Sequence, residues 1–153
     1  MLKLMRAALD GVSAPHVRRP LTLPPPQLPK VLLSVQRCCT LGCMRKFTIA
    51  CCQVRAFDIE DAEANLQNIL RSLDEAGAAG AELALLPECS YPAYYLKDQH
   101  PYDRPGVRPY AEVTALLGEK ARRHGYWLAA GLAAPSASGG VTNSGVVFGP
   151  DGA

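Results

Sequence analysis

The chain has 153 residues, of which 48% are hydrophobic and 20% are charged, with a formal net charge of +2. This balance is typical of a soluble globular protein of about one domain. The charge divides unevenly, because residues 1–43 hold six Lys or Arg and one acid, whereas residues 44–153 hold ten Lys or Arg and thirteen acids. An acidic domain without a basic patch argues against nucleic acid as a partner. The absence of any apolar run of eighteen residues argues against a membrane helix.

Six cysteines are present, at positions 38, 39, 43, 51, 52 and 89. Two pairs are adjacent in sequence and no CxxC occurs, so neither a disulfide framework nor a zinc site is favoured. We therefore expect reduced thiols in a cytoplasmic protein with no cofactor. A thiol redox or metal protein stays open as an alternative that rests on the cysteine count alone.

The first 43 residues give little sign of regular structure. Five prolines lie between positions 20 and 29, and prolines remove backbone donors that helices and sheets need. An Arg-rich, acid-poor segment suits a targeting peptide, but the prolines would break the amphipathic helix such a peptide requires. We favour the other interpretation, in which residues 1–43 are a disordered leader or an extension upstream of a natural start at Met44.

A strand and a helix are predicted directly after Met44. Residues 46–52 (KFTIACC) form a compact apolar run, which indicates a buried strand. Asp58 is a candidate N-cap, since the acids that follow it suit the positive end of a helix. An apolar face then repeats at helical spacing through Leu66, Ile69, Leu70 and Leu73. Gly77 or Gly80 is expected to end this helix.

The rest of the chain continues the alternation. Residues 82–86 and 126–131 are expected to be strands, with a helix over residues 109–124 between them. Trp127 is interpreted as a core residue and His124 as a helix-end cap. Residues 141–148 predict a fourth strand, and the sequence GPDG after it is a strong turn signal. Strands alternating with helices predict an α/β fold with a largely parallel sheet, whose last strand begins a hairpin.

Function in parallel α/β sheets gathers in loops at the carboxyl ends of strands. Two such loops, residues 53–57 and 88–108, follow predicted strands. Glu88 comes directly after an apolar strand and Pro87. A carboxylate held rigidly there and partly removed from water would have a raised pKa and would suit proton transfer. From the residues alone, an ordinary role in a turn or an ion pair is favoured over the catalytic one.

The segment LALLPECSYPAYY at residues 83–95 resembles the strand and glutamate motif of the nitrilase superfamily. Four further pieces resemble that family in the same order: KFTIACCQV, the helix containing Asn65, HGYWLAAG and TNSGVVFGPDG. The resemblance spans about residues 46–152. It implies that residues 44–153 are the N-terminal part of an αββα sandwich, incomplete at residue 153.

The resemblance also implies a Glu–Lys–Cys site that hydrolyses an amide or a nitrile through a thioester. Only the glutamate carries over, onto Glu88 as general base. Lys97, Lys120 and Cys89 do not match the family's lysine and cysteine, which we expect after residue 153.

Tyr91, Tyr94 and Tyr95 are candidates for the substrate pocket, with core packing as the alternative for each. His100 with two nearby aspartates could be drawn as a metal cluster, but a solvated loop is favoured and no metal is expected.

The sequence therefore predicts part of a carbon–nitrogen hydrolase acting on a small-molecule amide or nitrile. The resemblance further implies a homo-oligomer when the protein is full length. The alternative is a catalytically inert truncated product that acts only in binding or assembly.

Overall fold

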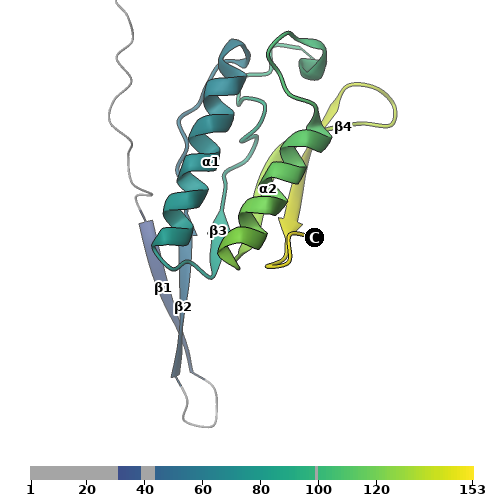
Figure 1. Ribbon diagram of the computed structural model, residues 1–153. Helices are drawn as coiled ribbons and strands as arrows, with labels where there is room; N and C mark the ends of the chain where they lie inside the picture. Colours follow the sequence, from purple (N-terminus) through teal and green to yellow (C-terminus); the bar gives the residue numbers. More distant parts are fainter. Residues whose placement is uncertain (1–30, 39–43, 99) are drawn as a thin grey trace, which may run out of the picture.

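The computed structural model describes residues 31–38, 44–98 and 100–153. These residues form one five-stranded sheet, in the order β1-β2-β3-β4-β5, with two helices packed on the same face (Figure 1). The strands are β1 (Val31–Cys38), β2 (Met44–Cys51), β3 (Leu83–Leu85), β4 (Trp127–Pro135) and β5 (Val141–Phe148). The helices are α1 (Ala62–Ala78) and α2 (Tyr110–His124), and short 3-10 turns, η1 (Ile59–Asp61) and η2 (Pro101–Asp103), precede them. No helix in this part of the chain is both long and apolar enough to cross a membrane.

The three central strands are parallel, as predicted. β2 pairs with β3, and β3 pairs with β4, so each crossover passes through one of the two helices. The two edge strands are antiparallel to their neighbours: β1 pairs with β2 and β5 pairs with β4. Parallel strands end at the same edge of a sheet, so the loops after β2 and β3 emerge side by side.

Strand β1 was not expected, and the prediction that regular structure begins only at Met44 is wrong for residues 31–38. These residues pair with the whole of β2, from Val31 opposite Cys51 to Cys38 opposite Met44. The reason is local: the run VLLSV is mostly apolar and carries two β-branched valines, and the prolines of the first 43 residues all lie before it. The predicted leader over residues 1–30 falls outside the described residues.

The helix ends agree only in part with the sequence. Asp58 begins the 3-10 turn η1 rather than α1, and its side chain makes no capping hydrogen bond. α2 ends as predicted, with Gly125 in the left-handed conformation at φ 68°. His124 lies in the last turn of α2, and its Nε2 lies 2.9 Å from Asp74 Oδ1 on α1. The two helices are thus joined by a polar contact as well as by their apolar faces.

The core lies between the helices and the sheet. It is built from side chains that are 1% exposed or less, including Leu66 and Leu73 of α1, Leu117 of α2 and Leu128 of β4. Burying an aliphatic side chain of this size contributes about 1.5–3 kcal/mol to folding. This core fixes the register of the strands that carry the site.

Trp127 is not in that core, and the prediction for it is wrong. Its side chain is 51% exposed, because Leu128 faces the helices and side chains alternate along a strand. Tyr126 is the buried aromatic residue instead, and its hydroxyl donates to the Leu73 carbonyl. Trp127 and Val147 lie on the face of the sheet opposite the helices. In an αββα sandwich this is the face that a second sheet covers, so the described residues form one α/β half of such a sandwich.

Candidate active site

The loops that follow β2 and β3 enclose a hollow, called here the Glu88 hollow, with a cavity volume of about 160 Å³. The two loops were the ones expected to carry function, and they meet where the parallel strands end. The hollow is lined by Val54, Arg55, Ala56, Phe57, Asn65, Pro87, Glu88, Cys89, Ser90 and Tyr94. Most of this wall is apolar, which leaves Glu88 and Arg55 as its charged members.

Glu88 stands on a bulge in the chain. The Leu86 N–H donates to the Ala129 carbonyl at 2.9 Å, and the Ser90 N–H donates to the Gly131 carbonyl at 2.8 Å. Ser90 comes four positions after Leu86, whereas Gly131 comes only two positions after Ala129. The chain around Glu88 therefore has two extra residues, which loop outward. The Ser90 hydroxyl donates to the Pro87 carbonyl at 2.6 Å and closes the bulge. The result is a carboxylate projected from a backbone that is fixed on both sides.

Gly131 allows β4 to approach this bulge. A Cβ at Gly131 would lie 2.7 Å from Glu88 Cα and 2.8 Å from the Pro87 carbonyl oxygen. Both neighbours are backbone atoms, which cannot swing aside as a side chain can. The absence of a side chain at Gly131 therefore sets the position of Glu88.

Asn143 of β5 holds the Glu88 carboxylate: its Nδ2 donates to Glu88 Oε1. Asn143 pairs with Ala133 in the β4–β5 register, which brings it beside the bulge. The partial desolvation expected for Glu88 is not found, because the side chain is exposed in the described structure. The physical reason is that Glu88 lies in the part of the bulge that loops outward. Asn143 was missed as a site residue, and the only sequence signal was its place in the Asn-bearing strand.

Asn65 anchors the loop from the helix side. Its side chain is 2% exposed, and its Nδ2 donates to the carbonyls of Ser90 at 2.7 Å and Pro92 at 3.0 Å. Two hydrogen bonds from one buried amide fix the loop directly after Glu88. The sequence placed Asn65 only as part of a helix match, because nothing local shows that it reaches residues 25 and 27 positions away.

The three candidate tyrosines have different surroundings. Tyr91 is 1% exposed, and its hydroxyl accepts a hydrogen bond from the Arg108 N–H at 2.7 Å, which is the packing of a core residue. Tyr94 lines the Glu88 hollow and is 54% exposed. Tyr95 is exposed as well and contacts Tyr94 edge to face, with ring centroids 5.3 Å apart. Only Tyr94 is therefore placed to touch a molecule in the hollow.

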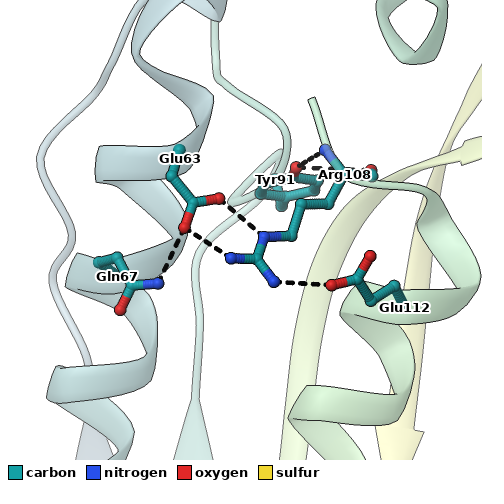
Figure 2. A network of polar contacts seen from close by, with 5 residues as sticks. All are labelled: Glu63, Gln67, Tyr91, Arg108 and Glu112. Atoms are coloured by element: carbon teal, nitrogen blue, oxygen red, sulfur yellow. Dashed lines mark hydrogen bonds and ion pairs between the residues drawn. The ribbon is translucent and has the colours of Figure 1, made fainter. Parts of the chain in front are cut away.

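Arg108 ties the far end of this loop to both helices (Figure 2). Its Nε and Nη2 each donate to the Glu63 carboxylate at 2.8 Å, and its Nη1 donates to Glu112 at 2.6 Å. The hydrogen bonds from Arg108 and then from Gln67 lower the pKa of Glu63 to about 2. Arg108 is thus held by its ion pairs and by the hydrogen bond from its N–H to the Tyr91 hydroxyl. The loop is therefore fixed by Arg108 as well as by Asn65.

The residues excluded as the family's lysine and cysteine have other neighbours. Lys97 pairs with Glu60 at 2.7 Å, and Lys120 pairs with Asp74 at 2.6 Å. Cys89 borders the hollow, but burial first and the charge of Glu88 second raise the pKa of its thiol. A thiol with a raised pKa is protonated at neutral pH and is a poor nucleophile.

The described side chains include those of three of the six cysteines and of the candidate metal-binding residues around His100. Cys51, Cys52 and Cys89 are free cysteines. Within residues 31–38, 44–98 and 100–153, no group of three or more His, Cys, Asp or Glu is arranged to hold a metal ion. The side chain of Asp98 is instead bonded to Arg104.

The profile of the carbon–nitrogen hydrolase family matches residues 48–153. The chain belongs to this family. No curated protein sequence matches the chain. Among solved structures, the NitFhit protein of C. elegans is 26% identical with a TM-score of 0.54, over 69% of this chain and 25% of that one. An amidase from Nesterenkonia sp. is 23% identical with a TM-score of 0.55, over 68% and 38%. A carbon–nitrogen hydrolase from Helicobacter pylori G27 is 22% identical with a TM-score of 0.50, over 69% and 36%.

These findings confirm the resemblance to the nitrilase superfamily and the α/β fold. The chain spans between a quarter and two fifths of the length of these solved relatives.

Proposed function

We propose that the carbon–nitrogen hydrolase region acts in the hydrolysis of a small amide or nitrile, with Glu88 as its general base and acid. The observation that carries the proposal is the geometry of Glu88: a carboxylate on a fixed bulge, beside a hollow and held by Asn143. Family membership supports the reaction class. Solved structures of the Nesterenkonia amidase include a variant with glutamine in place of a glutamate and an active-site cysteine that adds acrylamide.

The chemistry requires a nucleophile and a base in contact. A cysteine thiol is mostly protonated at neutral pH, so a neighbouring carboxylate must take its proton before it attacks the substrate carbon. In this chain Asn143 binds Oε1 of Glu88, which leaves Oε2 to exchange that proton. Glu88 then returns the proton to the leaving ammonia or amine and activates the water that releases the acid.

The remaining partners of the reaction are assigned to a longer protein. We place the nucleophilic cysteine, and the lysine that stabilises the oxyanion, in residues that follow position 153. Within the described residues, Tyr94 contacts the substrate and Tyr95 supports the Tyr94 ring. Tyr91 acts indirectly, by holding the loop that follows Glu88. The 153-residue chain is then inactive alone, and the full-length protein is a homo-oligomer.

The test is ammonia release from a panel of small amides and nitriles by a protein extended through the downstream reading frame. Glu88→Gln keeps the size of the side chain but removes the base, and we expect activity to fall about 100-fold or more. The matched control is Glu119→Gln. Glu119 lies on the exposed side of α2 and, in the described structure, pairs only with Arg122. Full activity in Glu88→Gln, or equal losses in both variants, would contradict the proposal.

The second candidate function is binding or assembly without catalysis. It is favoured by the uncovered face of the sheet, where Trp127 is 51% and Val147 is 62% exposed, since large apolar side chains gathered on one surface mark contact sites. Sedimentation of the 153-residue chain distinguishes the cases. A stable oligomer that Trp127→Ser dissociates would support assembly, whereas a monomer at all concentrations would count against it.

A further inference from the structure

The Glu88 hollow contains one cation without a carboxylate partner. Arg55 follows β2, is exposed, and lines the hollow together with Glu88. Among the residues that the structure describes, Arg104, Arg108 and Arg122 each pair with a carboxylate, whereas Arg55 takes part in no ion pair. Its charge is therefore available to a molecule that enters the hollow.

The Arg55 side chain is oriented by an aromatic ring. Its Cζ lies over the Phe57 ring, 5.5 Å from the centroid. A guanidinium on an aromatic face keeps its planar set of N–H donors, and that set matches the two oxygens of a carboxylate. Because the stacked group is already partly ordered, it loses less freedom when it binds an anion.

The other residues that line the Glu88 hollow determine where a charged group of a ligand can lie. Val54, Ala56, Phe57 and Pro87 offer apolar surface, which suits a short carbon chain. Glu88 repels a second carboxylate placed next to it, whereas Arg55 attracts one. An anionic substrate thus has one favourable direction, with its neutral amide at Glu88 and its charged end at Arg55.

We infer that the substrate is an amide or nitrile whose acyl chain carries a carboxylate, and that Arg55 is the specificity-determining residue that binds this carboxylate. The inference rests on the proposed function, because it takes the hollow beside Glu88 to be the place of the scissile bond. A neutral amide of the same length gains nothing from Arg55, so the difference between the two ligands measures the role of this residue.

The experiment is an NMR titration of the 153-residue chain with succinamate and with the neutral succinamide, which has the same carbon chain. We expect succinamate to bind about tenfold more tightly, which is the scale of a charge-assisted hydrogen-bonded pair, and to shift the backbone signals of Arg55, Phe57 and Glu88. Arg55→Gln should abolish the preference and Arg55→Lys should keep part of it. Arg123→Gln removes an exposed arginine of α2 outside the hollow and should change nothing.

The outcomes distinguish failure of the role proposed for Arg55 from failure of the proposed function. Equal binding of both ligands, with shifts around Glu88, would overturn the role of Arg55 and leave an amide site in place. A preference for succinamate that survives Arg55→Gln would do the same. Failure of both ligands to shift any signal around Glu88 would overturn the amide site and, with it, the inference.

Discussion

Replacing Gly131 by alanine should displace Glu88 and destabilise the fold. The added Cβ would lie 2.7 Å from Glu88 Cα and 2.8 Å from the Pro87 carbonyl oxygen, both closer than real Cβ contacts. Neither backbone atom can rotate away, so β4 and the bulge must separate by several tenths of an ångström. Overpacking of this kind costs about 1–3 kcal/mol. For a domain of this size, that corresponds to a fall in Tm of about 2–12 °C.

Gly145 provides a matched control on the neighbouring strand. It pairs directly with Gly131, and a Cβ there would meet nothing within 4 Å. Gly145→Ala should leave Tm unchanged or slightly raised, since alanine restricts the unfolded chain more than glycine does. Thermal unfolding followed by circular dichroism measures both variants, and the Asn143 side-chain amide signals report the position of Glu88. Equal Tm values for the two variants, with unmoved Asn143 signals in Gly131→Ala, would refute the reasoning.

Asn143→Leu removes the donor to Glu88 and should lower kcat/KM of the extended protein about tenfold in the ammonia assay; unchanged activity would show that Glu88 needs no such donor. The folded-state pKa of Glu63 is about 2, below its ordinary 4.5, so its contribution to stability is complete above pH 4.5 and is lost as pH falls toward 2. The Tm difference between wild type and Glu63→Gln should therefore shrink over that range, and a constant difference would contradict the assignment. Cys89 has a left-handed backbone conformation, with φ 46°. Cys89→Gly should therefore raise the free energy of unfolding by about 1 kcal/mol, and Cys89→Val should lower it, as measured by urea denaturation. Equal effects of the two substitutions would argue against backbone strain.

The order of elements after Met44 could be predicted because each has a local signal. The apolar face of α1 repeats at helical spacing, and Gly125 ends α2 in the conformation that glycine favours. β1 could not be predicted because its apolar run, VLLSV, is short and directly follows a proline-rich stretch that disfavours regular structure. The side on which Trp127 lies was also missed, since a short apolar run does not show which alternate residues face the helices.

The site was predictable as far as one residue. Glu88 could be found because it follows an apolar strand within a family-like motif. Its contacts could not, because Asn143 reaches it through the β4–β5 register and Asn65 reaches the loop from α1. Tyr91 shows the same limit: its sequence position suited a pocket wall, and only the fold reveals that Arg108 binds its hydroxyl.

The most direct measurement compares ammonia release by the 153-residue chain with that by the protein extended through the downstream reading frame, each with and without Glu88→Gln. If these residues hold the base of the site but not its nucleophile, only the extended protein is active, and Glu88→Gln abolishes that activity. Ammonia release by the 153-residue chain that depends on Glu88 would contradict the account, because the nucleophile would then lie within these residues, with Cys89 as the first candidate.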